Sequence, residues 1–197
     1  MELKSVFGLP AHPFLVHMPV VLIPLAALVA LAAVFLPRHR RPLSLVVAAL
    51  AIVSAGGAIL AAGSGEALQE AIGENDALVR QHAELGEGTR TFAILFAIAA
   101  IGFVIHHWPD RFKLGPDSAL GKLARAKQFF AVTAAAMILT AGLATVWTIR
   151  TGHSGAKAVW KEKWDNRGNE RGGGPGENDE SRAMVLPATA SAPGTRR

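Results

Sequence analysis

The sequence predicts an all-α integral membrane protein, a four-helix up-down-up-down bundle followed by a disordered C-terminal tail. Three observations lead to this fold class. Hydrophobic residues make up 51% of the 197 residues and charged residues only 18%, below the quarter that is typical of soluble domains. Four apolar segments approach the roughly 20 residues needed to cross a bilayer. None of them has a charged residue at its centre, whereas a soluble helix shows polar residues along its outer face.

The four apolar segments define one domain over residues 1–164. The connection "PRHRRP" between the first two is bracketed by Pro37 and Pro42, which predicts a tight turn between antiparallel neighbours. The predicted helices cover about residues 14–36, 43–63, 91–107 and 129–149.

Two further segments are predicted from composition. The acidic connection between the second and third helices has apolar residues on one side, which predicts a short amphipathic helix within residues 66–81. These residues are Leu68, Ile72, Leu78 and Val79. Residues 165–197 are rich in Gly, Pro, Asn and charge, and they have too little apolar surface to fold. We therefore expect a disordered tail there.

The charges of the connections predict the orientation. Two connections, between helices one and two and between three and four, are basic, whereas the connection between two and three holds only Arg80 and Arg90 against six acids. By the positive-inside rule the basic side is cytoplasmic, so both termini lie outside the cytoplasm. The basic residues on that side are Arg38, Arg40, Arg41, Arg111, Lys113, Lys122, Arg125 and Lys127.

Composition also excludes several classes. The chain has no Cys, which excludes disulfide frameworks, iron–sulfur clusters and thiolate metal sites. Its net charge of +5 does not indicate nucleic-acid binding, because the basic residues flank apolar segments where a lipid bilayer is the partner. No G-x-S-x-G pattern is present, and Ser154 directly after His153 is not triad geometry. We do not expect a stand-alone enzyme.

Histidines gather on one side of the predicted bundle. His12 and His17 lie at the outer end of helix one, His82 precedes helix three, and His153 follows helix four. Three distant segments therefore bring the same ligand type to one membrane depth. Neutral imidazole binds haem iron, copper, zinc and non-haem iron, so the pattern predicts either haem b or one transition-metal ion.

The residues leave haem and a bare metal ion open. Haem b needs two imidazoles on facing helices and small residues beside the porphyrin, and glycines are available at Gly57, Gly63, Gly65, Gly142 and Gly152. A bare ion needs three or four donors, and Glu66 or Glu84 would complete such a set with the same histidines.

His17 lies about one turn inside an apolar segment, where an imidazole without a partner is costly. Prolines 13, 19 and 24 predict a bent entry to the first helix. We therefore expect His17 to point into the bundle and to meet His82 or His153, with His12 as an outer ligand or as a partner that fixes an imidazole tautomer.

The segments "GLPAHPFLVHMPVVLIPLA", "HAELGE" and "TGHSGAKAVW" together resemble the bacterial membrane family called domain of unknown function 2231, over about residues 8–160. Trp160 stands where that family usually has tyrosine. The family is similar to four-helix membrane cytochromes of the b type, which implies haem b as cofactor and the bacterial inner membrane as location. Matched by motif, the implied ligands are His12, His17, His82 and His153.

Two hypotheses follow. The first is a haem- or metal-binding protein that transfers electrons at the outer face. Its expected partners are a redox partner protein and, in a homo-oligomer, a second copy of the chain. The alternative is a non-enzymatic structural or interaction subunit of the membrane whose histidines only pack or sense pH. A transporter is disfavoured, because the helix centres contain only Ser and Thr as polar groups.

Overall fold

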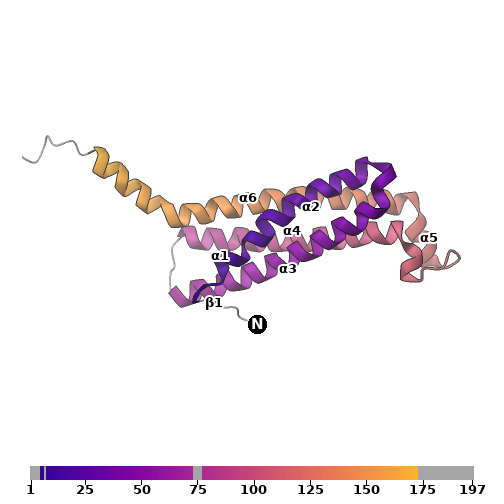
Figure 1. Cartoon of the computed structure of the whole chain (residues 1–197), viewed down its shortest axis with the longest axis horizontal. Coiled ribbons are helices and arrows are strands. Elements are labelled where there is room, and N and C mark those ends of the chain that lie inside the picture. Colours follow the sequence, from indigo (N-terminus) through magenta and orange to yellow (C-terminus); the bar gives the residue numbers. More distant parts are fainter. Residues whose placement is uncertain (1–4, 7, 73–76, 173–197) are drawn as a thin grey trace, which may run out of the picture. The chain divides into compact units, whose positions relative to one another are not determined.

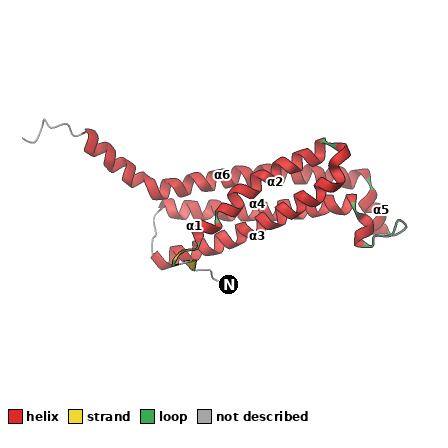
Figure 2. Cartoon of the chain, viewed as in Figure 1, coloured by secondary structure: helices red, strands yellow, loops and turns green. Residues whose placement is uncertain are grey.

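The computed structural model describes residues 5–6, 8–72 and 77–172. These residues are almost entirely helical (Figure 2). The chain divides into two compact units, Met1–Ala158 and Val159–Arg197. The first contains the bundle, and the described part of the second is the C-terminal end of the last helix.

Four long helices form the bundle, and short elements precede and connect them. The long helices are α2 (His17–Phe35), α3 (Arg40–Ile72), α4 (Ala77–His107) and α6 (Lys127–Gly172). The short elements are β1 (Ser5–Val6), β2 (Leu9–Pro10), α1 (His12–Leu15), the 3-10 helices η1 (Pro37–His39) and η2 (Pro109–Phe112), and α5 (Ala119–Arg125). The two strands pair antiparallel, with Val6 opposite Leu9.

The long helices alternate in direction, as the sequence predicted (Figure 1). Helix α3 packs against both α2 and α4, and side chains of α6 share the core with α4. We call the end that holds His12, Ser64, His82 and Ser154 the histidine end. The opposite end holds the turns over residues 36–39 and 108–126, and we call it the basic end.

The entry to the bundle is broken, as the prolines predicted. Helix α1 ends at Leu15 and α2 begins at His17, with Val16 between them. Pro19 has no N–H to donate to the carbonyl of Leu15, so the helical hydrogen-bond ladder is interrupted there. The short α1 is thereby set apart from α2, and it carries His12 at its first position.

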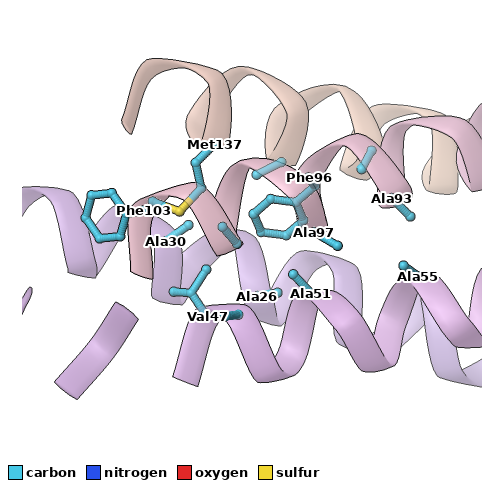
Figure 3. Packing of buried hydrophobic residues seen from close by; sticks show 14 of the residues in the cluster. Ala26, Ala30, Val47, Ala51, Ala55, Ala93, Phe96, Ala97, Phe103 and Met137 are labelled. Atoms are coloured by element: carbon cyan, nitrogen blue, oxygen red, sulfur yellow. The ribbon is translucent and has the colours of Figure 1, made fainter. Parts of the chain in front are cut away.

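The core consists mostly of alanine. Ile23, Ala26 and Ala30 of α2 are fully buried at helical spacing, and they pack in one cluster with Phe96 and Phe103 of α4. Figure 3 shows the small side chains of α2 and α3 facing these phenylalanines and Met137 of α6. Small residues let helix backbones approach closely, which is what drives association in lipid, where burial of apolar surface gives no advantage.

Two close crossings depend on glycine. A Cβ on Gly57 would lie 2.8 Å from the Cβ of Met18, so α2 and α3 touch here with no room for a side chain. A Cβ on Gly88 would collide with the indole of Trp147, which packs against Phe92 at 5.0 Å between ring centres. Each helical hairpin therefore has one crossing at which a large side chain occupies the space over a glycine.

One predicted element is wrong. The described residues of the predicted segment, 66–72 and 77–81, form no separate helix, because α3 continues to Ile72 and α4 already begins at Ala77. The stretches next to the apolar segments, such as "EALQEAI" at 66–72, are rich in Ala, Leu, Glu and Gln, which are good helix formers, so the helices continue past the point where hydropathy falls. The third helix consequently starts at residue 77 rather than 91.

The last helix is also longer than predicted. It continues through the Gly152–Gly155 motif and on to Gly172, so residues 165–172 of the predicted tail are helical. The remainder of the predicted tail, residues 173–197, lies outside the described residues.

The four helices are long and apolar enough to cross a membrane, over His12–Phe35, Pro37–Ala71, Ala77–His107 and Lys127–Lys161. Their outward side chains are large and hydrophobic, such as Leu28, Phe35, Val132 and Leu139, each more than 60% exposed. A face of this kind suits lipid as its surroundings.

The crossing at Gly57 predicts opposite effects for two adjacent substitutions. Gly57→Ala forces a Cβ against Met18 and should destabilise the bundle by about 1–3 kcal/mol. Gly56→Ala enters open space on the exposed side and should stabilise the helix by about 0.5–1 kcal/mol. Thermal unfolding in detergent, followed by circular dichroism, measures both. Midpoints that move in the same direction would contradict the close crossing.

Candidate histidine site

His12 is held by the neighbouring helix α3. Its Nδ1 lies 2.9 Å from the carbonyl oxygen of Ala61 and 3.3 Å from the hydroxyl oxygen of Ser64. The Ser64 hydroxyl itself donates to the Ala61 carbonyl at 2.9 Å. Because a carbonyl only accepts, the proton of the neutral ring must be on Nδ1, and Nε2 carries the free lone pair.

His82 is held in the same way by α6. Its Nδ1 donates to the carbonyl oxygen of Thr151 at 3.0 Å and to the hydroxyl oxygen of Ser154 at 3.1 Å. Ser154 in turn donates to the Thr151 carbonyl at 2.9 Å. This imidazole therefore also has its proton on Nδ1 and its lone pair on Nε2.

A glycine lies beneath each ring. A Cβ on Gly65 would come within 3.0 Å of Cε1 of His12, and a Cβ on Gly155 within 2.9 Å of Cε1 of His82. Each imidazole thus occupies the space that a side chain would otherwise fill. We call the Ser-Gly pairs Ser64–Gly65 and Ser154–Gly155 the two cradles.

The two cradles bring the histidines together. The ring centres of His12 and His82 lie 6.0 Å apart, with the ring planes at 82° to each other. Both side chains are half-buried. The structure therefore pairs one imidazole from α1 with one from α4 at the histidine end.

The expectation for His17 is wrong. Its side chain is exposed, and its Nδ1 donates to the carbonyl of Pro13 on its own side of the bundle, at 2.6 Å. It begins α2, beyond the break at Val16, whereas His12 begins α1. It is His12, not His17, that meets His82.

The remaining predicted ligands are not drawn into the pair. His153 is exposed, since it lies one residue and about 100° around α6 from the buried Ser154. Glu66 and Glu84 are exposed as well. Within the described ranges no group of three or more His, Cys, Asp or Glu residues is close enough to hold a metal ion. The set of histidines with Glu66 or Glu84 is therefore not assembled there.

The cradles were not identified as such in the sequence. Gly65 was expected to leave room for a porphyrin, but its space is taken by His12, and that of Gly57 by Met18. At Gly63, Gly142 and Gly152 a Cβ would meet no atom within 4 Å. The signal that would have found the cradles is the Ser-Gly dipeptide, which ends both "GSG" at 63–65 and "HSG" at 153–155.

The other histidines with defined contacts lie at the basic end. Nδ1 of His106 donates to the carbonyl of Ala124, and Nδ1 of His107 to that of Phe103, both at 2.8 Å. Arg41 stacks on Trp108 with its guanidinium 4.2 Å from the ring centre. Contacts of this kind are typical of side chains that pack at the interface between lipid and water.

Comparison with known proteins places the chain in a family. A family model described as "Predicted membrane protein (DUF2231)" matches residues 8–167. The chain belongs to this family. The part that matches the DUF2231 model contains His12, His82 and both cradles. No curated protein and no solved structure matches the chain.

The geometry of the pair predicts the tautomers of its two rings. Nitrogen-15 NMR of the detergent-solubilised protein with labelled histidine, at a pH where the rings are neutral, should show a protonated Nδ1 for His12 and His82. His12→Ala and His82→Ala assign the two signals, and the exposed His153 provides a solvent-averaged reference. A proton on Nε2 of either ring would contradict the hydrogen bonds to Ala61 and Thr151.

Proposed function

We propose that this membrane protein binds one haem b between His12 and His82 and transfers electrons at the outer face of the bacterial inner membrane. The observation that carries the proposal is the pair itself, two imidazoles from different helices with ring centres 6.0 Å apart. Metal–nitrogen bonds of about 2.0–2.1 Å imply roughly 5–6.5 Å between the ring centres of two imidazoles on one ion. The pair therefore has the separation that a shared ion requires.

The tautomers support the same interpretation. Metal-ligating histidines generally donate their other ring N–H to a carbonyl or carboxylate, which orients the ring and makes the ligating nitrogen more basic. His12 and His82 both donate through Nδ1 to main-chain carbonyls. Each therefore keeps Nε2, the nitrogen that would ligate, in its unprotonated form.

The number of donors favours haem over a bare ion. Structural sites for a single transition-metal ion take three or four protein ligands, and no such group exists among the described residues. Haem iron is already bound by the porphyrin and needs few further ligands from the protein, so His12 and His82 alone would hold it. When bound, haem b would supply a one-electron couple.

The charge distribution supports the outer location. The basic end holds eight Lys and Arg residues against Asp110 and Asp117, and Asp110 is paired with Arg125 at 2.7 Å. A basic end of this kind is expected on the cytoplasmic side, which leaves the histidine end facing outward.

Visible absorption spectroscopy tests for the cofactor. The protein purified from cells supplied with haem precursor should show a reduced-minus-oxidised spectrum of a low-spin b-type haem. His12→Ala and His82→Ala should each abolish the low-spin signal, whereas His17→Ala, an equally conservative change on the exposed side, should retain it. All three variants should accumulate in the membrane at normal levels.

Two outcomes would replace the proposal. Stoichiometric zinc, copper or iron without haem would identify a bare ion. A colourless, metal-free protein that also fails to take up added haem would leave the non-enzymatic subunit with packing or pH-sensing histidines.

Orientation is tested separately, because the chain has no native cysteine. We expect a membrane-impermeant maleimide to label Glu84→Cys at the histidine end of spheroplasts, and Lys122→Cys at the basic end only after the membrane is permeabilised. Both positions are exposed. The reverse labelling pattern would place the histidine pair on the cytoplasmic side.

A further inference from the structure

The histidine contact and a helix crossing both occur twice, with the same spacing. His12 on Ser64 corresponds to His82 on Ser154, a shift of 70 residues for the first partner and 90 for the second. The crossing of Met18 with Gly57 shifts by the same 70 and 90 residues onto Gly88 and Trp147. We call α2 and α4 the outgoing helices and α3 and α6 the returning helices of the first and second hairpin. The glycine of the crossing is on the returning helix α3 in the first hairpin and on the outgoing helix α4 in the second. Both hairpins thus have a glycine contact at equivalent positions, with the glycine and the large side chain exchanged between the two helices.

Buried positions follow the same two shifts. On α2 the residues Ile23, Ala26 and Ala30 are buried, and the residues 70 positions later, Ala93, Phe96 and Ala100 of α4, are buried too. Helical periodicity alone would also allow the two hairpins to be aligned with other shifts. The two recurring contacts select the shifts of 70 and 90 residues, because each contact joins specific residues of the two helices.

The returning helices agree with the second shift. Val47, Ala51 and Ser54 of α3 are buried, and so are Met137, Ala141 and Ala144 of α6, 90 positions later. The extra 20 residues lie at the basic end, where η1 alone links α2 to α3 while η2 and α5 link α4 to α6. The outgoing helices α2 and α4 run in the same direction, so the hairpins are parallel repeats, related by an axis along the bundle.

We infer that the chain consists of two tandem copies of one helical hairpin, and that Ser64–Gly65 and Ser154–Gly155 are equivalent positioning residues that hold His12 and His82 as a two-fold symmetric pair of ligands for one occupant on the axis between the hairpins. The nature of the occupant, haem iron, rests on the proposed function. The equivalence of the cradles rests on the contacts above.

Each residue of a cradle has a separate role. The serine hydroxyl donates to the carbonyl three residues earlier, which leaves its lone pairs to accept from Nδ1–H and gives the imidazole a second acceptor. The glycine leaves free the space that Cε1 and Nδ1 of the ring occupy. The two halves therefore present the same nitrogen from equivalent supports.

The test compares matched alanine substitutions. Gly65→Ala and Gly155→Ala should each weaken haem binding at least tenfold and agree with one another within about threefold, since the cradles are equivalent. Gly56→Ala, on the same helix as Gly65 and next to open space, should bind haem as the parent protein does. Titration of haem into the purified apoprotein measures all three variants.

The serines are tested against a third buried serine. Ser64→Ala and Ser154→Ala should each weaken haem binding about tenfold and shift the midpoint potential in the same direction. Ser54→Ala is the control, because Ser54 is fully buried and donates to the carbonyl of Ala51 with the same spacing, far from either histidine.

The outcomes separate this inference from the proposed function. If haem binds but only one cradle affects it, the equivalence is overturned while the haem proposal stands. If the protein takes up no haem, the haem proposal fails, and NMR of the imidazoles then tests the cradles. Gly65→Ala should displace the Nδ1–H signal of His12 alone, and Gly155→Ala that of His82 alone. Unchanged signals would overturn the inference.

Discussion

The histidine end depends on one interaction, the hydrogen bond from an imidazole Nδ1–H to a main-chain carbonyl of the neighbouring helix. The carbonyls of Ala61 and Thr151 each accept from an imidazole as well as from the hydroxyl of the cradle serine on their own helix. Each hairpin is closed by its turn at the basic end and by this bond at the other. The orientation of both rings, and hence their pairing, follows from these two bonds.

Between its ends the bundle is held by close packing of small side chains. Lipid removes the usual advantage of burying apolar surface, so association depends on contact between backbones and on satisfied polar groups. Alanines on α2, α3, α4 and α6 supply that contact, and Gly57 and Gly88 admit Met18 and Trp147 where larger groups cross. Buried hydroxyls such as Ser54 and Thr148 donate to carbonyls of their own helix, so they add no polar group that lacks a partner.

The fold could be predicted from the sequence, whereas the site could be predicted only in part. Hydropathy indicates where a helix meets lipid, but it does not indicate where the hydrogen bonding of the helix ends. It therefore could not predict that α3 extends to Ile72 or that α4 begins as early as Ala77. His12 and His82 were correctly placed at one end. Which of His12 and His17 faces inward depends on rotation about the helix axis beyond the break at Val16, and hydropathy carries little information about it.

The lengths of the helices have a consequence for the route of electrons. Ser64 lies 24 residues beyond Arg40 along α3, which at 1.5 Å per residue places it about 36 Å from the basic end. The hydrocarbon core of a bilayer is only about 30 Å thick, so the two ends of the bundle reach opposite headgroup regions and the histidine pair lies at one of them. In the proposed orientation, a haem held by this pair would be next to water on the outer side and separated from the cytoplasm by the whole membrane. Donor and acceptor would then both dock on the outer surface, and the proposed electron transfer would carry no charge across the bilayer.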